Sequence, residues 1–442
     1  MADTEGKPVL PVNKEGIFMN INEYREKLIS GKLDSQLELL YKKNGTAKQR
    51  ARYVEALDSF SQTYPERGDI HVYSASGRTE IGGNHTDHQH GCVIAAAVNL
   101  DVIGVAAFHN EGVIRIKSKG YEPFEVTLSD LGVQKGEEGS AAIVRGIAAR
   151  FAQMGVEIGG FDMYTTSDVI QGSGISSSAA FENLISTSID SYYNENRAGA
   201  VEVAKIGQFA ENVYFGKNSG LMDQLVSSVG GFVFIDFADV DDPAIEKVDF
   251  DLESAGCKLI ITDTKGSHCD LTADYDAVRS EMEAVAEYFG KSFLRETDEA
   301  QFWEKMPDIR RKTSDRAVMR AAHFFADSRR AGAEKQALAE GDFGRFLALV
   351  NESGDSSMNL LQNLYSVRKP TNQEIPLAIM AGKRILGGRG AIRVHGGGFA
   401  GTIQAFVPDD LADAYQAEMD RIFGENSCYI MTVRPVGGIE IA

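Results

Sequence analysis

A dense group of polar side chains occupies residues 76–91, directly after a predicted strand. A carboxylate can accept two hydroxyl hydrogen bonds and an imidazole can donate or accept one, so this composition favours binding of a polyhydroxylated ligand. A hydrophilic surface turn and a metal site are the alternatives, although the spacing matches neither HExxH nor a zinc finger. The side chains are Arg78, Glu80, His85, Asp87, His88 and His90.

A second chemical segment, residues 172–180, combines two glycines with three successive serines and precedes a predicted helix. Glycines let successive backbone N–H groups converge, and the helix adds its own unsatisfied N–H groups and the positive end of its dipole. The hydroxyls suit a phosphate or a metal. A serine N-cap after a flexible loop is the alternative, but one serine would suffice for that. We therefore expect a phosphate-binding loop.

A third segment, residues 395–402, is rich in glycine. Gly396, Gly398 and Gly401 match the GxGxxG pattern of dinucleotide-binding proteins. That pattern requires a following helix, whereas residues 402–407 are typical of a strand. We expect instead that this backbone approaches a ligand or another segment closely.

Two acids between these segments, Glu211 and Asp223, are further candidates for chemistry. Asp223 is flanked by Met222 and by leucines, so it is not fully solvated. An aspartate in apolar surroundings is rare unless it is paired or functional. Arg78 is a plausible counter-charge for Asp223, although the sequence does not show that they meet.

Apolar periodicity predicts the elements that position these segments. Predicted helices cover residues 17–64, 140–154, 177–194, 199–215, 271–290 and 410–423. Predicted strands cover residues 70–75, 101–108, 112–118, 123–128, 161–166, 232–237, 258–262, 391–394, 402–407 and 428–434. The acidic run 239–243 is typical of a connector. The β-β-α-β order at the end, with the earlier strand and helix, favours a ferredoxin-like α+β sandwich.

Composition excludes several classes of protein. The chain has 442 residues and a net charge of −19, which argues against a nucleic-acid or anionic membrane surface as a partner. No apolar stretch is long enough for a membrane span. Four cysteines in so long a chain do not form a disulfide framework, which indicates a reducing compartment, and the absence of CxxC spacing argues against structural zinc. We expect a cytoplasmic protein, monomeric, of two or three domains.

Taken in order, the motifs resemble those of the galactokinases within the GHMP small-molecule kinases. The sugar signature close to G-R-x-N-L-I-G-E-H-T-D-Y corresponds to residues 77–88, and the phosphate loop G-L-S-S-S-A to residues 174–179. The N-S-G-I-M-D-Q motif corresponds to residues 218–224, and R-M-T-G-G-G-F-G-G to residues 393–401. A weaker match to S-E-Y-N-x-R-R lies at residues 273–279. The resemblance spans about residues 70–435.

The resemblance implies an α+β fold of two domains. Residues 67–245 would form an N-terminal domain like ribosomal protein S5 domain 2, and residues 246–442 a ferredoxin-like domain. Residues 1–66 would be a helical extension. ATP and sugar would meet between the two domains, and the enzyme would phosphorylate the anomeric hydroxyl of D-galactose to give α-D-galactose 1-phosphate.

The resemblance also implies the roles of single residues. Asp223 would be the base or charge partner of the anomeric hydroxyl, and Arg78 would stabilise that centre. Ser177 and Glu211 would hold Mg²⁺. The sugar would be bound by Asn84, His85, Asp87, Gly220 and Tyr275. The ATP phosphates would be wrapped by Gly172, Ser173, Gly174, Ser176, Ser177, Ser178 and Ala179.

Three departures from the family pattern concern the sugar pocket. The family glutamate that contacts the C6 hydroxyl is Asn84 here, the family asparagine is Glu80, and the family tyrosine is His88. The S-H-x-S element corresponds to residues 353–356, without its histidine. An amide in place of the acid removes repulsion toward a C6 carboxylate, so a kinase for a uronic acid such as galacturonate is the main alternative. A regulator that binds ATP and sugar without turnover is the second.

Overall fold

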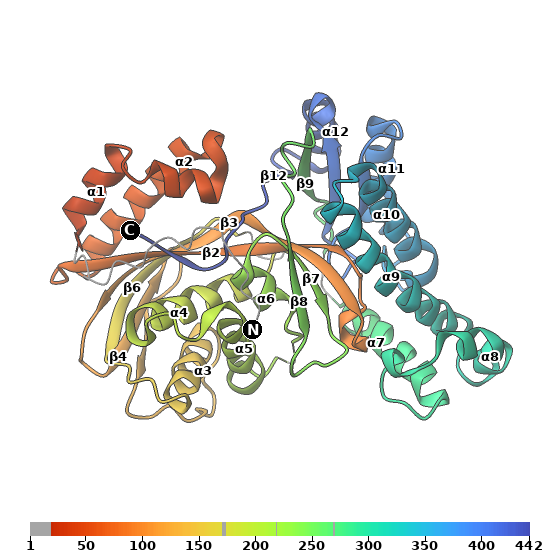
Figure 1. Ribbon diagram of the computed structural model, residues 1–442, viewed down its shortest axis with the longest axis horizontal. Helices are drawn as coiled ribbons and strands as arrows, with labels where there is room; N and C mark the ends of the chain where they lie inside the picture. Colours follow the sequence, from red (N-terminus) through yellow and green to blue (C-terminus); the bar gives the residue numbers. More distant parts are fainter. Residues whose placement is uncertain (1–18, 170–173, 218, 268–269) are drawn as a thin grey trace.

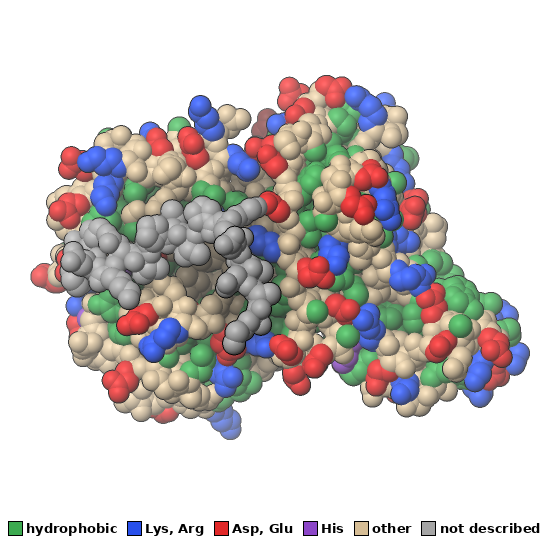
Figure 2. All heavy atoms as spheres, in the orientation of Figure 1, with side chains coloured by type: hydrophobic (Ala, Val, Ile, Leu, Met, Phe, Trp, Pro, Cys, Tyr) green, Lys and Arg blue, Asp and Glu red, His purple; other side chains and the backbone are tan. Residues whose placement is uncertain are grey.

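The computed structural model describes residues 19–169, 174–217, 219–267 and 270–442. The described chain is built on two sheets with helices packed against them (Figure 1). On the face seen in Figure 2, basic side chains are interspersed with acidic ones. No helix among the described residues is long and apolar enough to cross a membrane.

The first sheet has nine strands and carries the predicted sugar loop. Its path is β1-β2-β3-β6-β4-β5, with β7 also paired to β3, β8 to β7 and β13 to β2. All pairs are antiparallel except β4 with β6. The strands are β1 (Met19–Asn20), β2 (Asp69–Gly82), β3 (Cys92–Phe108), β4 (Val113–Ser118), β5 (Phe124–Thr127), β6 (Gly160–Ser167), β7 (Phe232–Asp236), β8 (Ala244–Val248) and β13 (Ile439–Ile441).

Helices cover both faces of this sheet (Figure 1). Side chains alternate between the faces of a strand, so Val72 of β2 packs in the core under the N-terminal helices while Tyr73 packs in the main core. The N-terminal helices are α1 (Ile21–Ile29) and α2 (Asp34–Thr63). The opposite face carries α3 (Ser140–Gln153), α4 (Ser177–Asn194), α5 (Gly199–Phe209), the π-helix η2 (Ala210–Phe215) and α6 (Met222–Val229).

The second sheet confirms the predicted ferredoxin-like arrangement. Its strands lie in the order β10-β11-β9-β12, and all pairs are antiparallel. Two helices, α11 and α12, pack on it through a core that includes Tyr415 and Ile403. The elements are β9 (Cys257–Asp263), α11 (Glu374–Leu386), β10 (Ala391–Val394), β11 (Thr402–Pro408), η5 (Asp409–Leu411), α12 (Ala412–Phe423) and β12 (Cys428–Met431).

A helical layer between β9 and α11 was only partly expected from the sequence, which predicts the first of its helices alone. The long helix α9 contacts both β2 and β3, so it brings the second half of the chain against the predicted sugar loop. The layer comprises α7 (Thr272–Tyr288), η3 (Leu294–Glu296), α8 (Glu299–Lys312), α9 (Asp315–Ala339), α10 (Phe343–Ser356) and the π-helix η4 (Ser357–Leu361).

Two boundaries differ from the sequence-based expectation. Strand β2 continues to Gly82, so the loop before β3 covers only residues 83–91 and includes the short helix η1 (Asp87–Gln89). The end of β2 lacks the apolar pattern of a strand and was therefore expected to be a loop. Its Arg78 and Glu80 side chains face the polar cavity rather than an apolar core. The expected domain boundary after residue 245 falls inside β8, which pairs with β7. The division into domains stays a prediction, and β13 returns the C-terminus to the first sheet.

Candidate functional site

A cavity of about 250 Å³ lies where three of the sequence motifs meet. It contains six of the predicted site residues, which come from β2, η1, η2, α6 and the segment before α6. Its polar character contrasts with the apolar cores on either side. The lining residues are Arg78, Glu80, His85, Asp87, His88, Glu211, Ser219, Gly220, Met222, Asp223, Gln224, Gly396 and Gly397.

Asp223 and Arg78 form the ion pair that the sequence suggested. Arg78 donates from Nε to Asp223 Oδ1 at 2.8 Å, and its Nη2 lies 2.6 Å from the same oxygen. Ser176 Oγ donates to the other carboxylate oxygen, Oδ2. Arg78 also donates from Nη1 to the carbonyl of Gly174. Asp223 therefore lies at the junction between the cavity and the predicted phosphate loop.

The described part of the phosphate loop has the backbone of an anion cradle. Gly174 and Ser176 have φ values of 73° and 59°, and α4 begins at the next residue, Ser177. The Ser176 side chain does not cap this helix, so the first-turn N–H groups of an 18-residue helix remain available to an anion. These features fit the phosphates of ATP. Of the other predicted phosphate ligands, Ser178 is exposed and Ala179 buried, while Gly172 and Ser173 lie outside the described residues.

Glu211 is buried and held by three donors. It accepts from Lys217 Nζ at 2.7 Å, from Ser219 Oγ at 2.5 Å and from Gln224 Nε2 at 3.0 Å. Gln224 Nε2 also donates to Glu182 at 2.9 Å, and burial together with Glu211 raises the pKa of Glu182 to about 8. A carboxylate and nearby hydroxyls are the hard oxygen ligands that suit Mg²⁺, which keeps water and phosphate oxygens as its other ligands.

Asp87 and His85 supply hydrogen-bonding groups to the cavity wall. His85 Nε2 contacts the carbonyl of Gly397 at 2.9 Å and must donate to it, which leaves Nδ1 as an acceptor in the neutral ring. Burial lowers the pKa of His85 and raises that of Asp87. A Cβ on Gly220 would lie 3.3 Å from Asp87 Oδ2, so glycine leaves room beside this acid.

The four-residue metal site considered from the sequence does not converge. His90 stacks on Phe293 with ring centroids 3.7 Å apart, and it does not line the cavity.

Asn84 does not line the cavity, contrary to the expectation that it binds the sugar. It is fully buried, and its amide donates to Glu80 Oε1 at 2.7 Å and to the Gly396 carbonyl at 2.8 Å. Its oxygen accepts from Asn363 Nδ2 at 2.8 Å. Because every polar atom of the side chain has an internal partner, Asn84 is a structural link. Glu80 lies at the wall in its place.

Helix α9 holds the backbone of Asn84 from both sides. The Asn84 N–H donates to Asp327 Oδ2 at 2.8 Å, and its carbonyl lies 2.8 Å from His323 Nε2. His323 must donate there, so its Nδ1 accepts from Ser356 Oγ at 2.8 Å. These contacts fix the chain just before His85, whose φ of 58° is unusual for a residue with a side chain.

Tyr275 lies outside the cavity lining, and its expected contact with the sugar stays a prediction. Its hydroxyl donates to the carbonyl of Gly398 at 2.9 Å and holds the third glycine-rich segment. Gly398 has a φ of 77°, and a Cβ there would lie 2.1 Å from the Asn363 carbonyl oxygen. The glycines therefore serve a close approach of backbone to other segments, as the sequence predicted.

Several lining residues were not assigned to the site from the sequence. The alternation of Arg78 and Glu80 along a strand could have indicated that both face one side. No local signal indicates that His88, Ser219, Gln224, Gly396 and Gly397 converge, since they come from three segments far apart in the sequence. Burial and His85 lower the pKa of His88 to about 3, so it is neutral.

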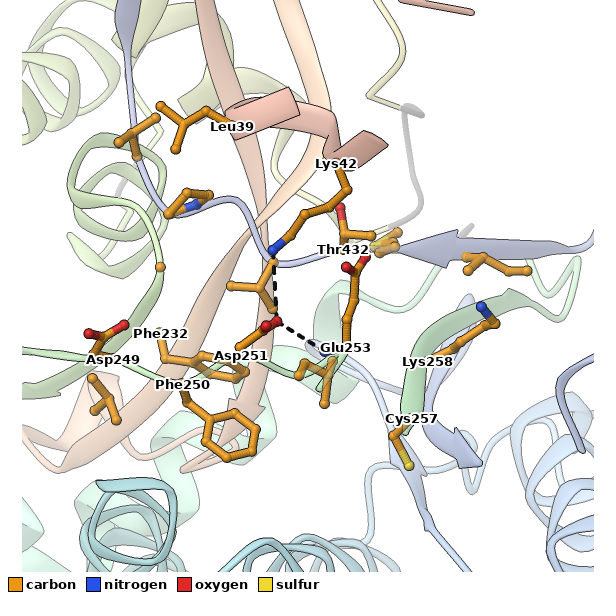
Figure 3. A pocket seen from close by; sticks show the side chains of 18 of the residues that line it. Leu39, Lys42, Phe232, Asp249, Phe250, Asp251, Glu253, Cys257, Lys258 and Thr432 are labelled. Carbon is orange, nitrogen blue, oxygen red and sulfur yellow. Dashed lines mark hydrogen bonds and ion pairs between the residues drawn. The ribbon is translucent and has the colours of Figure 1, made fainter. Parts of the chain in front are cut away.

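A larger cavity of about 1300 Å³ lies elsewhere, between α2, the segment before β9, β12 and the C-terminal segment. Figure 3 shows Lys42 of α2 reaching toward Asp251, with 3.8 Å between Nζ and Oδ1. Phe232 and Phe250 lie beside them. None of the described predicted site residues lines this cavity. Its lining mixes lysines and acids but includes no part of the predicted phosphate loop, so the smaller cavity is the candidate site.

Comparisons with known proteins agree with this choice. The galactokinase galactose-binding signature matches residues 58–108, and the GHMP kinase N-terminal domain matches residues 142–231. The first range includes Arg78 and Asp87, and the second includes the phosphate loop and Asp223. This chain has the GHMP kinase fold and carries the galactokinase signature.

Solved structures with the GHMP kinase fold cover most of the chain. Lactococcus lactis galactokinase in complex with galactose has a TM-score of 0.73 at 20% identity, covering 86% of this chain and 98% of its own. A putative sugar kinase from Campylobacter jejuni has a TM-score of 0.56 at 17% identity, covering 84% and 98%. Methanococcus jannaschii mevalonate kinase has a TM-score of 0.58 at 13% identity, covering 82% and 98%.

Proposed function

We propose that this protein transfers the terminal phosphoryl group of ATP to the anomeric hydroxyl of a neutral hexose, D-galactose, giving α-D-galactose 1-phosphate. The observation that carries the proposal is the position of Asp223. Its carboxylate lines the cavity and accepts a hydrogen bond from Ser176 of the phosphate loop. An acceptor hydroxyl bound in the cavity would thus meet a proton acceptor and the phosphoryl donor at one point.

In the proposed mechanism, backbone N–H groups around Gly174 and the start of α4 bind the phosphates. Ser177 and Glu211 would hold Mg²⁺, which neutralises charge on the phosphates. Asp223 accepts the hydroxyl proton as the oxygen attacks phosphorus. Arg78, paired to Asp223 at 2.6 Å, holds that carboxylate in its orientation. Phosphoryl transfer depends mainly on such positioning and charge stabilisation.

The charge of the cavity supports a neutral sugar over a uronate. Four carboxylates line it, from Glu80, Asp87, Glu211 and Asp223, and Arg78 is committed to one of them. A ligand carboxylate would add a like charge at close range. The amide of Asn84, one argument for a uronic acid kinase, makes its hydrogen bonds within the protein instead of facing the cavity.

Catalysis is also supported over a regulator that only binds ATP and sugar. A sensor needs the cradle and the cavity, but it does not need an acid between them. Here Arg78 and Ser176 both fix the Asp223 carboxylate at that junction. Such pre-organisation of a proton acceptor favours turnover.

The test is a coupled assay of ADP release with Mg-ATP against galactose, galacturonate, glucuronate, N-acetylgalactosamine, arabinose and glucose. Galactose should give the highest kcat/KM, and ³¹P NMR of the product should show phosphorus coupled to the anomeric proton. A uronate preference would retain the mechanism and change the substrate. Measurable ATP and sugar binding without ADP release would replace the proposal with a sensor.

A further inference from the structure

We propose that Glu80 is the acid that binds a hydroxyl of the sugar substrate in this cavity, and that it discriminates against sugars carrying a carboxylate. This inference rests on the proposed function and deepens it. It assigns the specificity to a strand residue rather than to the loop residue Asn84. Four observations support it: strand register, hydrogen bonding, charge and the relation to Asn84.

The register of β2 directs Glu80 to the same face as Arg78. Arg78, Thr79 and Glu80 pair consecutively with Ala97, Ala96 and Ala95 of β3, without a register shift between them. Side chains two residues apart in a regular strand lie on one face. Since Arg78 reaches Asp223, Glu80 must stand along the same wall, and it does line the cavity.

The hydrogen bonds of Glu80 leave one oxygen for a ligand. Oε1 accepts from Asn84 Nδ2 at 2.7 Å and lies 3.4 Å from Arg393 Nη2. Oε2 has no hydrogen-bond partner among the described residues. It is also absent from the fully buried side-chain atoms that lack a partner, so it remains accessible. A carboxylate fixed through one oxygen and open through the other is pre-organised to accept a hydroxyl hydrogen bond.

Charged groups on several elements surround Glu80. Arg78 of β2 and Arg393 of β10 favour its charged form, while Asp87 of η1 disfavours it. Glu334 of α9 is a fully buried acid on the same side, with its carboxylate close to Gly82. Burial outweighs the two arginines and raises the pKa of Glu80 to about 7. Glu80 therefore changes charge near neutral pH, neutral below this value and anionic above it.

Glu80 and Asn84 exchange the residue types found in the galactokinase pattern, where the asparagine comes first and the glutamate second. Here the two side chains are joined by the 2.7 Å hydrogen bond. The exchange keeps one acid and one amide in contact, but it places the acid on the strand. The amide takes the buried position, where it donates to Glu80 and Gly396 and accepts from Asn363.

The decisive measurement is the ratio of kcat/KM for galacturonate to that for galactose at pH 6 and pH 8. The uronate stays ionised over this range, whereas Glu80 passes from about one-tenth to about nine-tenths ionised. In the wild type the ratio should fall about ninefold as pH rises. In Glu80→Gln it should be independent of pH, and higher than wild type at pH 8 by about tenfold. Glu425→Gln, an exposed acid-to-amide change, is the matched control and should behave as wild type.

A second measurement identifies the contact, and its first part uses only the wild type. Calorimetric binding of the 2-, 3-, 4- and 6-deoxygalactoses to the wild type should show one analogue that is weakened about tenfold or more at pH 8. In Glu80→Gln, the binding affinity for that same analogue should not fall further. The combination of deoxy sugar and variant forms a thermodynamic cycle that isolates the contact between one hydroxyl and Glu80.

The outcomes separate the two proposals. Galactose turnover with a ratio that is flat between pH 6 and pH 8 in the wild type overturns the role of Glu80 and leaves the kinase intact. Equal additional losses for all four deoxy sugars in Glu80→Gln also overturn it. A wild type that neither binds nor phosphorylates any of these sugars overturns both.

Discussion

At the scale of single residues, the site depends on one carboxylate that is held by two neighbours. Asp223 is only one-third exposed, and it is bound by Arg78 and by Ser176. Arg78 in turn holds the carbonyl of Gly174. The proton acceptor and the phosphate loop are thus parts of one hydrogen-bonded unit, and a change at Asp223 should affect chemistry more than nucleotide binding.

Asp223→Asn should lower kcat by about 100-fold or more while leaving ATP affinity within a small factor of wild type. An amide cannot accept the hydroxyl proton, and positioned general bases typically contribute factors of about 10²–10⁴. The N–H cradle that binds the phosphates remains. Steady-state kinetics and calorimetric ATP titration measure the two effects. Asp413→Asn on the surface of α12 is the control. Near wild-type turnover in Asp223→Asn would remove this residue from the mechanism.

At the scale of elements, the short helix α6 presents Asp223 from its first turn, and its end is held by the C-terminal segment. Gly230 follows α6 with a φ of 75°, and a Cβ there would lie 2.3 Å from the backbone carbon of Val436. Lys247 of β8 donates to the carbonyl of Val229, next to this glycine. The position of α6 thus depends on segments far away in the sequence.

Gly230→Ala should cost about 2–6 kcal/mol of unfolding free energy, because the backbone at φ 75° and ψ 163°, a region almost confined to glycine, adds about 1–3 kcal/mol of strain to a steric clash of about 1–3 kcal/mol. Gly256→Ala is the matched variant. Its φ is 68°, but no atom lies within 4 Å of the added Cβ, so it should lose about 1 kcal/mol. Urea unfolding curves give both values. Equal losses would mean that the tail does not confine the end of α6.

At the scale of the whole molecule, a buried aspartate joins both ends of the described chain to the first sheet. Asp101 of β3 is fully buried. Arg52 of α2 donates to it at 2.5 Å, and Arg434, beyond β12, approaches it at 3.3 Å. Tyr41 and Ser74 also donate to it. The N-terminal helices are therefore an integral part of the fold rather than an appendage.

Asp101→Asn should cost about 3–5 kcal/mol at pH 7, since it leaves two buried guanidiniums without their anion. Burial acts to raise the pKa of Asp101, but Arg52 and Arg434 hold it below its ordinary value. A depressed pKa in the folded state gives stability that is present above the unfolded pKa of about 3.9 and is lost as the pH falls below it. The advantage of wild type over Asp101→Asn should therefore shrink below pH 4.

Urea midpoints at pH 7 and pH 3 measure this difference. The control is Asp410→Asn, which removes an exposed ion pair with Arg389 and should leave the midpoint nearly unchanged at pH 7. An advantage of wild type that grows toward pH 3 would contradict the assigned charge state of Asp101.

The sequence by itself determined the features that depend on local order. Glycines and serines before an apolar helix specified the phosphate loop, and the apolar period specified the N-terminal helices and the ferredoxin-like end of the chain. An aspartate in apolar surroundings indicated a partner, and Arg78 provides it. The loop and the helices were predictable because each depends on the order of neighbouring residues, whereas Arg78 lies 145 positions from Asp223 and was only a candidate partner.

The tertiary structure alone decided which side chains reach the cavity. Asn84 and Tyr275 have side chains that could bind a sugar. Their polar groups instead form hydrogen bonds with α9 and with the glycine-rich segment. Glu80 reaches the wall because β2 continues past its expected end and, after a register shift between Ser76 and Arg78, pairs again with β3. Helix α9 and strand β10 lie hundreds of positions from β2 in the chain, so no local pattern records how they pack around it. The motif at residues 77–88 thus indicated where the site lies. The packing of α9 and β10 around β2 decided that Glu80, and not Asn84, lines the cavity.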